Sequence, residues 1–196
     1  MAEHVSIIVP TVNRPTLART LASIDAERRA GDEVLVIGPP ETPVPAWCRR
    51  FETPPDSTPK KWGGPERRLG IAHATADYLA FLDDDDIYLP GWRAAMAEAA
   101  TVTPQRPVIF RMEDAATGKR WWRDGEPHLQ NGNFGSPCIF MPNVPEKLGT
   151  WTDHFEGDFR FVNGMWWSKY SRRHTRARPS VVFRPEIIAL LRPHAA

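Results

Sequence analysis

The chain has 196 residues, of which 41% are hydrophobic and 25% are charged, and its formal net charge is +1. This composition argues against a disordered protein, and the near-neutral total indicates no particular partner. The length is typical of one globular domain with a substantial core. No apolar run approaches the roughly 20 residues of a membrane span. The N-terminus has no basic stretch followed by an apolar region, so we expect no signal peptide.

The first 37 residues predict a β-α-β unit. Val5–Val9 is an apolar run typical of a buried strand, and Val34–Ile37 is a second one. Between them a helix starts near Pro15 and ends at Gly31. Two strands joined by a helical crossover run parallel, which favours an α/β fold.

The later elements extend this pattern. Residues 38–61 are rich in proline and predict a long loop, which in a compact domain is usually functional or mobile. We expect one α/β domain over residues 1–196, with a mostly parallel sheet flanked by helices and a small antiparallel element. The remaining elements are predicted as helices over 65–76, 90–100 and 159–170, strands over 78–82, 139–141, 181–183 and 187–191, and a hairpin of 108–112 with 118–122.

The two cysteines, Cys48 and Cys138, lie far apart in the sequence and fit no zinc-binding spacing. We interpret them as reduced thiols, which are typical of cytosolic proteins. We therefore expect a cytoplasmic protein.

Four consecutive aspartates, Asp83 to Asp86, directly follow the short apolar run Tyr78–Leu82. Because that run predicts a buried strand, the acids fall just past its carboxyl end, where open α/β sheets bind their ligands. Crowded carboxylates raise one another's pKa and destabilise the fold, and a bound divalent cation would relieve this repulsion. Oxygen ligands of this kind suit Mg²⁺ or Mn²⁺ completed by phosphate oxygens and water.

Two simpler interpretations compete with this metal–diphosphate site. The acids could form an exposed turn before the helix at Pro90, but the dipole of that helix fades too soon to stabilise Asp83–Asp85. An EF-hand calcium loop starting at Asp83 would need glycine at its sixth position and glutamate at its twelfth. Those positions hold Tyr88 and Ala94, so that interpretation fails.

Three segments together resemble family 2 glycosyltransferases of the GT-A fold. Val5–Pro15 (VSIIVPTVNRP) resembles the opening strand and donor-binding turn of that family. Gly70–Pro90, with the sequence YLAFLDDDD inside it, resembles the family's helix, strand and Asp-x-Asp loop. Leu148–Asp158 (LGTWTDHFEGD) resembles, more loosely, the segment that carries the catalytic carboxylate. The resemblance implies a GT-A (Rossmann-like) domain, with a nucleotide-sugar and metal half over 1–100 and an acceptor and catalytic-base half over 101–196.

The resemblance also implies roles for individual residues. Asp85 and Asp83 are the implied metal ligands, with His174 as a further candidate, although a histidine in a basic loop is more often simply solvated. The family usually has an aspartate pair after the second strand that reads the base, and here that position holds Gly38-Pro39-Pro40-Glu41. UDP is therefore the favoured donor nucleotide by analogy alone. The donor-binding candidates are Pro10, Thr11, Asn13, Arg14, Glu41, Lys60, Lys61, Arg67, Asp83 and Asp84.

Transfer with inversion needs one carboxylate to deprotonate the acceptor hydroxyl. Asp158 aligns best with the base of the family, and Glu156 and Asp153 are the alternatives. The competing interpretation of Asp158 is a helix cap, because helix N-termini attract aspartates.

We therefore expect a Mn²⁺- or Mg²⁺-dependent inverting hexosyl- or pentosyltransferase that uses a nucleotide-diphosphate sugar. The acceptor stays open between a saccharide, a small molecule and modified DNA. Modified DNA is suggested by residues 159–185, which contain no acid before Glu186 and include Arg172, Arg173 and Arg176 close to Trp166 and Trp167. A nucleotidyltransferase-like enzyme and a non-catalytic sugar-nucleotide-binding module are the alternatives. The turn at 10–14 contains no glycine, which disfavours the first, and the intact acid cluster disfavours the second.

Overall fold

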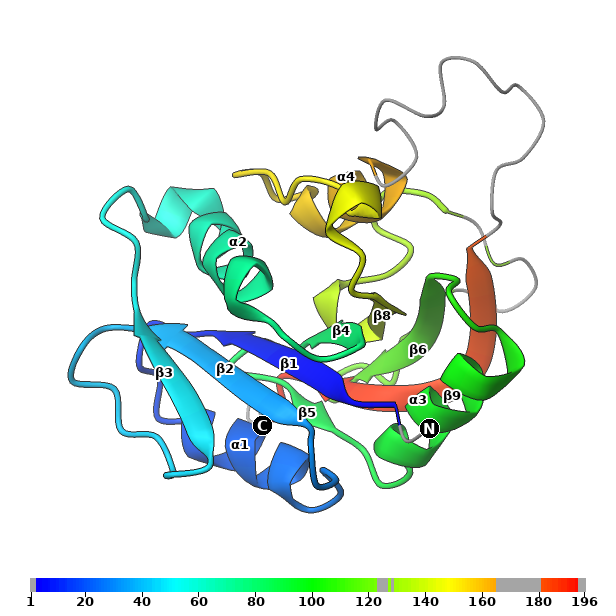
Figure 1. Ribbon diagram of the computed structural model, residues 1–196, viewed down its shortest axis with the longest axis horizontal. Helices are drawn as coiled ribbons and strands as arrows, with labels where there is room; N and C mark the ends of the chain where they lie inside the picture. Colours follow the sequence, from blue (N-terminus) through cyan, green and yellow to red (C-terminus); the bar gives the residue numbers. More distant parts are fainter. Residues whose placement is uncertain (1–2, 123–126, 128, 165–180, 194–196) are drawn as a thin grey trace.

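A single sheet of nine strands organises the protein, in the order β3-β2-β1-β4-β8-β6-β9-β5, with β7 paired to β6. In this computed structural model, α2 and α4 lie on one face of the sheet, and α1 and α3 lie on the other (Figure 1). The structure describes residues 3–122, 127, 129–164 and 181–193. The strands are β1 (Val5–Pro10), β2 (Glu33–Gly38), β3 (Cys48–Glu52), β4 (Tyr78–Phe81), β5 (Ile87–Tyr88), β6 (Val108–Asp114), β7 (Arg120–Trp121), β8 (Ile139–Pro142) and β9 (Val182–Leu191).

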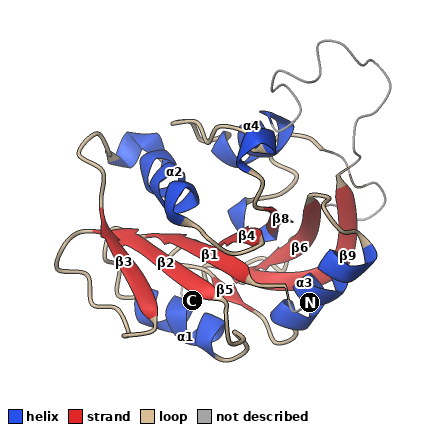
Figure 2. Cartoon of the chain, in the orientation of Figure 1, coloured by secondary structure: helices blue, strands red, loops and turns tan. Residues whose placement is uncertain are grey.

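The helices cover both faces of this sheet, so that the fold has three layers (Figure 2). Their buried positions recur at helical spacing, as with Leu17, Leu21 and Ile24 in α1. The helices are α1 (Leu17–Asp25), α2 (Gly64–His73), α3 (Trp92–Val102) and α4 (Gly157–Gly164), with short 3₁₀ turns at Pro59–Lys61, Ser136–Cys138 and Pro145–Lys147.

The predicted β-α-β unit is confirmed. β1 pairs in parallel with β2 on one side and with β4 on the other. Every residue of β1 and β4 is buried, as expected for strands covered by helices on both faces. Ile8 in β1 lies opposite Phe81 in β4, so the aspartates that follow β4 emerge at the same edge as the turn after β1.

The predicted antiparallel element is also present. β8 runs antiparallel to both β4 and β6, and β5 runs antiparallel to β9. The predicted hairpin is confirmed by the pairing of Met112 with Trp121. The mixed α/β sheet therefore has the expected fold class, and its strands come from both predicted halves of the chain.

Several element boundaries differ from the prediction. The segment over 38–61 is not all loop, because β3 lies within it and pairs in parallel with β2 at the sheet edge. Helix α1 ends at Asp25 rather than Gly31. The two predicted C-terminal strands form one strand, β9, and the short strand β5 was not predicted. Helix α4 starts at Gly157, and the part of the predicted helix beyond residue 164 lies outside the described residues.

Gly70 lets α2 rest directly on the sheet. A Cβ at this position would lie 2.6 Å from Cγ2 of Ile8 and 3.1 Å from Cδ1 of Ile37, closer than packed side chains allow. The helix axis is therefore as near to β1 and β2 as its backbone permits. This close packing sets the distance from the sheet of the residues one turn earlier, including Arg67.

Cys48 and Cys138 are both free thiols, as expected. Burial raises the pKa of each to about 12, so neither is poised to react as a thiolate. Within the described residues, no helix has both the length and the apolar character needed to span a membrane.

Candidate active site

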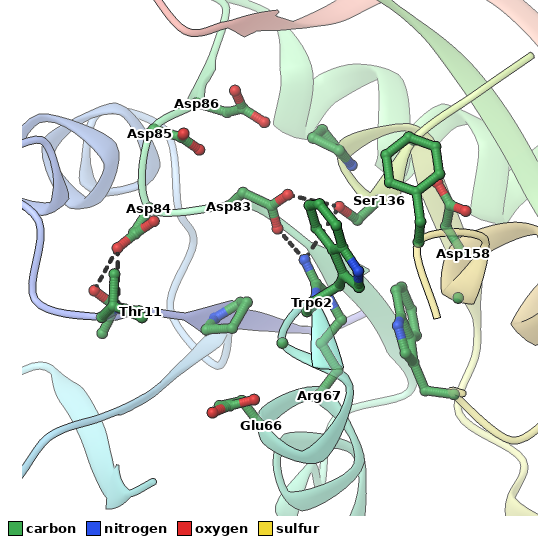
Figure 3. A pocket seen from close by; sticks show the side chains of 18 of the residues that line it. Thr11, Trp62, Glu66, Arg67, Asp83, Asp84, Asp85, Asp86, Ser136 and Asp158 are labelled. Carbon is green, nitrogen blue, oxygen red and sulfur yellow. Dashed lines mark hydrogen bonds and ion pairs between the residues drawn. The ribbon is translucent and has the colours of Figure 1, made fainter. Parts of the chain in front are cut away.

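A cavity of about 860 Å³ opens at the carboxyl ends of β1, β2 and β4. This is the edge at which ligands of parallel sheets bind. The acidic loop forms one side, and Asp158 lies on the other side in Figure 3. The lining includes Pro10, Thr11, Val12, Arg14, Pro39, Trp62, Glu66, Arg67, Asp83, Asp84, Asp85, Asp86, Ser136, Trp151, His154, Phe155, Asp158 and Arg192.

Asp84 ties the acidic loop to the turn after β1. Its carboxylate accepts hydrogen bonds from Oγ1 of Thr11 at 2.6 Å and from the backbone N–H of Val12 at 3.2 Å. Nη1 of Arg14 lies 2.9 Å from its other oxygen. The side chain is buried, and both of its carboxylate oxygens accept hydrogen bonds from within the protein. Asp84 therefore holds the two turns together at the wall of the cavity.

Asp85 is more open. Its side chain is 31% exposed, and its Oδ2 pairs with Nη1 of Arg14 at 2.7 Å. Partial burial raises its pKa, and the charges of Asp83 and Asp84 raise it further, while Arg14 opposes this. Arg14 thus bridges Asp84 and Asp85 and offsets part of the repulsion that the sequence predicted.

Asp83 points toward a buried arginine. Nη2 of Arg67 donates to Oδ1 of Asp83, and the hydroxyl of Ser136 donates to Oδ2 at 3.1 Å. Arg67 is itself held by the carbonyl of Trp62, at 2.8 Å from Nη1, and its guanidinium lies 4.8 Å from the ring centre of Trp151. Asp83 and Arg67 therefore form one ion pair that connects β4 to the start of α2.

Asp86 turns away into the protein. It is buried, and its Oδ1 accepts the backbone N–H of Arg192, just past β9, at 3.0 Å. Burial raises its pKa to about 8, with a further contribution from the charge of Asp83. The side chain of Arg192 pairs with Asp114 at 2.6 Å. Asp86 thus connects the acidic loop to the end of β9.

Asp158 is the carboxylate on the opposite side. It lies in the first turn of α4, and its Oδ1 accepts the backbone N–H of Phe159 at 2.6 Å. Burial raises its pKa to about 6, against the effect of that hydrogen bond and of the positive charge of Arg67. A carboxyl group with a pKa near 6 is suited to accept a proton at neutral pH.

The two alternative bases lie outside the cavity lining. Asp153 pairs with Nη1 of Arg68 at 2.5 Å and with Lys61 at 3.5 Å, and the Arg68 guanidinium lowers its pKa. Glu156 pairs with Arg160 at 3.2 Å and accepts a hydrogen bond from Asn131 at 2.7 Å. The geometry therefore favours Asp158 among the three.

The donor-binding candidates divide into two groups. Pro10, Thr11, Arg14, Arg67, Asp83 and Asp84 all line the cavity. Asn13, Glu41 and Lys60 are exposed and lie outside the lining. Lys61 also lies outside it and pairs with Asp56 at 3.0 Å. His174, Trp166, Trp167, Arg172, Arg173 and Arg176 lie outside the described residues.

Sequence reasoning missed several residues of the lining, among them Ser136, Trp151, Phe155 and Arg192. Ser136 begins a short 3₁₀ turn, Trp151 and Phe155 come from loops, and Arg192 follows the last strand. Trp151 and Phe155 flank Asp153 in the segment that resembled the catalytic-base region, so their position in that segment could have indicated them. Ser136 and Arg192 belong to no motif, and only the folded arrangement brings them to the acidic loop.

The acidic loop can supply only part of the coordination shell of a divalent cation. No group of three or more His, Cys, Asp or Glu side chains within the described ranges is close enough to form a cage. Asp84 and Asp86 are buried and bonded within the protein, which leaves Asp85 and Asp83 partly exposed at the cavity. Mg²⁺ and Mn²⁺ commonly bind through one or two carboxylates and take phosphate and water oxygens for the rest. The donor set is compatible with such an ion, which Asp85 and Asp83 would hold.

Comparison of the sequence identifies relatives. A family model described as "Glycosyl transferase family 2" matches residues 57–177. The succinoglycan biosynthesis protein ExoM of Rhizobium meliloti (strain 1021) is 31% identical over 137 residues, which cover 64% of this chain and 44% of ExoM. The chain thus matches less than half the length of this curated relative.

Solved structures share the fold. TarS of S. aureus (residues 1–349) superposes with a TM-score of 0.67 at 13% identity, covering 95% of this chain and 60% of that one. The complexes of the same protein with UDP and with UDP-GlcNAc give TM-scores of 0.62 and 0.60 at 14% identity, covering 95% and 98% of this chain and 59% and 61% of theirs. The family model covers more than half of the sequence, and the fold agrees with it. The chain therefore belongs to glycosyl transferase family 2.

Proposed function

We propose that this protein is a metal-dependent inverting glycosyltransferase that moves a sugar from a nucleotide-diphosphate sugar, most favourably a UDP-sugar, to an acceptor hydroxyl. One observation carries the proposal. Asp158, a half-buried carboxyl group with its pKa raised to about 6, faces the same cavity as the acidic loop. A base and a diphosphate-binding edge on opposite sides of one cavity leave room for the two substrates between them.

The donor side is the edge formed by the turn after β1 and the acidic loop. Two arginines, Arg14 and Arg67, reach this edge, and each is paired with aspartates of the loop. Fork-shaped guanidinium groups bind phosphate oxygens well. TarS, which shares the fold, was solved with UDP and UDP-GlcNAc, and this supports a uridine diphosphate donor here.

Asp85 and Asp83 would hold a Mn²⁺ or Mg²⁺ ion at this edge. When bound, such an ion neutralises charge that develops on the departing diphosphate. Arg14 and Arg67 would add positive charge on the protein side of the same oxygens. Asp84 keeps the loop in place for this purpose through Thr11 and Val12.

Asp158 would act on the acceptor. Its carboxylate takes the proton from the acceptor hydroxyl while that oxygen forms a bond to the anomeric carbon of the donor. The bond from that carbon to the diphosphate oxygen breaks, and its electron pair leaves with the diphosphate. Attack from the face opposite the leaving group inverts the anomeric centre. The protonated Asp158 then loses its proton to solvent.

The proposal is tested by measuring nucleoside-diphosphate release from UDP-, GDP- and dTDP-sugars, with manganese and with EDTA. We expect slow hydrolysis of a UDP-sugar even without an acceptor, its loss in EDTA, and its loss in Asp85→Asn. Asp158→Asn should bind the donor normally. Absence of release from every donor at any manganese concentration would argue for a non-catalytic module.

A further inference from the structure

Two exposed aromatic side chains meet beside the cavity. Trp62 is 58% exposed and Phe155 is 71% exposed, and both line the cavity. Their rings lie edge to face, with centroids 5.4 Å apart and an interplanar angle of 74°. They come from segments 93 positions apart, so the fold brings them together. We name Trp62 and Phe155 the aromatic pair.

The backbone at Trp62 is unfavourable and is held in place. Trp62 has φ 52° and the next residue, Gly63, has φ 70°, so two consecutive residues occupy the left-handed region. Left-handed backbone is unfavourable for a residue with a side chain, because Cβ comes too close to the following carbonyl oxygen. Nη1 of Arg67 holds this turn by donating to the carbonyl of Trp62, and a Cβ at Gly63 would lie 2.6 Å from that nitrogen.

This turn therefore presents a large apolar ring to solvent at a cost in backbone energy. Such outliers persist where the surrounding structure enforces them, and they gather at ligand-binding sites. Figure 3 shows the Trp62 side chain between the Arg67–Asp83 pair and Asp158 in that view. A ligand that covers the indole would bury apolar surface that the folded protein leaves exposed to water.

We propose that the aromatic pair binds a sugar ring of the acceptor and so presents one of its hydroxyls to Asp158. The proposal rests on the glycosyltransferase activity proposed above. Phe155 lies three residues before Asp158, on the segment that leads into α4, so this member of the pair is on the same side of the cavity as the base, and Trp62 meets it from the turn just before α2. The C–H face of a pyranose packs on an aromatic ring while its hydroxyls stay free for hydrogen bonds, as amphipathic ligands do on tryptophan.

The charges around the pair favour an uncharged saccharide over a nucleic acid. Lys61 pairs with Asp56 and Asp153, and Arg68 pairs with Asp153. Arg160 pairs with Glu156. A phosphate backbone binds along a surface with an excess of positive charge, and within the described residues these three cations are balanced by three acids, Asp56, Asp153 and Glu156. A neutral ring needs only the apolar surface and the nearby polar groups.

The test is saturation-transfer NMR with three probes: methyl β-D-glucopyranoside, methyl β-D-galactopyranoside and cellobiose, each added to the protein with UDP and Mn²⁺. We expect at least one probe to bind the wild type through its ring C–H protons. Trp62→Ala and Phe155→Ala should weaken that probe about tenfold, which corresponds to about 1.4 kcal/mol, and Trp62→Phe should restore part of it. Val102→Ala, which trims another exposed apolar side chain on α3, is the matched control and should bind as the wild type does.

Other results would overturn the proposal. No probe binding to the wild type, or equal binding to Trp62→Ala, would end it. Salt-sensitive binding of a dT₁₂ oligonucleotide that Trp62→Ala abolishes, in place of sugar binding, would assign the pair to a nucleic acid. Loss of UDP affinity in Trp62→Ala, measured by calorimetry, would assign it to the donor. If the wild type binds a sugar probe but no nucleoside diphosphate, the proposed function fails while the saccharide site stands.

Trp62→Gly separates binding from folding. Glycine adopts positive φ without strain, so this change should leave the melting temperature unchanged or raise it while sugar binding is lost. A purely structural role for Trp62 predicts the reverse, a lower melting temperature with any sugar binding retained.

Discussion

Arg67 donates to the carboxylate of Asp83, and this contact joins the first aspartate of the acidic loop to the first turns of α2. The arginine is buried, whereas the aspartate is about one-third exposed toward the cavity. The same guanidinium holds the carbonyl of Trp62. One side chain thus sets the position of both the donor edge and the aromatic pair.

Replacement of Arg67 should therefore damage both stability and catalysis. Arg67→Met leaves Asp83 unpaired beside a low-dielectric interior and should lower the free energy of unfolding by about 2 kcal/mol. Arg160→Met is the control, because its pair with Glu156 is exposed and should contribute less than about 1 kcal/mol. Urea unfolding measures both. Arg67→Lys keeps the charge but loses the fork, and its kcat/KM for donor hydrolysis should fall at least tenfold. Wild-type kinetics in Arg67→Lys would remove Arg67 from the donor site.

The pH dependence of stability should report Asp158. Its pKa rises from an ordinary 3.8 to about 6 in the folded protein, so the folded state holds this proton more tightly than the unfolded chain does. The resulting stabilisation is complete below about pH 4 and is lost as the pH rises through about 6. Asp158→Asn avoids this loss and should be more stable than the wild type at pH 8, by on the order of 3 kcal/mol.

The same substitution should abolish transfer. In the wild type, kcat/KM should rise with pH and level off above an apparent pKa near 6, because the base must be ionised. Thermal unfolding at pH 4 and pH 8, together with a pH–rate profile, checks both expectations. If the stability difference between Asp158→Asn and the wild type were the same at pH 4 and pH 8, the pKa of Asp158 would not be raised in the folded protein. If Asp158→Asn were still active, Asp158 would not be the base.

Manganese affinity should distinguish two neighbouring aspartates. Asp85→Asn removes a partly exposed ligand and should weaken Mn²⁺ binding in the presence of UDP by at least tenfold. Asp84→Asn replaces a buried acceptor with an amide and should cost about 2 kcal/mol of stability while the cation still binds. Electron paramagnetic resonance counts free Mn²⁺ in each case. Equal affinity in both variants would place the ion elsewhere.

A buried ion pair far from the cavity should control stability alone. Arg93 in α3 contacts Asp32 through Nε at 2.7 Å and Nη2 at 2.9 Å, and both side chains are almost fully buried. Asp32 also accepts the N–H of Val5 at the start of β1. Asp32→Asn should destabilise the fold by about 3 kcal/mol, since it leaves a buried guanidinium without its counter-charge. Asp25→Asn, an exposed acid, is the control. The kcat of the folded fraction should stay at the wild-type value.

Local sequence patterns predicted most of the sheet and the edge at which the acidic loop emerges. The runs that became β1, β2 and β4 are short and wholly apolar, and such runs have few alternatives to a buried strand. Asp83–Asp86 follow one of them directly, so the edge at which they emerge follows from the parallel topology. Strand β3 was missed because its sequence, CRRFE, is mostly polar, as an edge strand with a partly solvated surface can be.

The roles within the acidic loop could not be predicted, because they depend on contacts between distant segments. Asp84 and Asp85 are neighbours in the sequence, yet one faces Thr11 in the interior and the other faces the cavity. Asp86 meets a backbone N–H 106 positions later. The resemblance alone favoured Asp158 over Asp153, whereas the pairing of Asp153 with Arg68 is encoded by no local pattern.

Gly70 never touches the cavity, yet it lies one helical turn from Arg67. Since α2 already lies against Ile8 and Ile37, any added methyl group must lift the helix off the sheet. This displacement would move the guanidinium of Arg67 away from Asp83. It would also move Trp62, whose carbonyl Arg67 holds. Substitution of Gly70 is thus limited by the placement of Arg67 and Trp62 at the cavity as well as by the volume of the core. Random mutagenesis followed by selection for activity should retain glycine at this position.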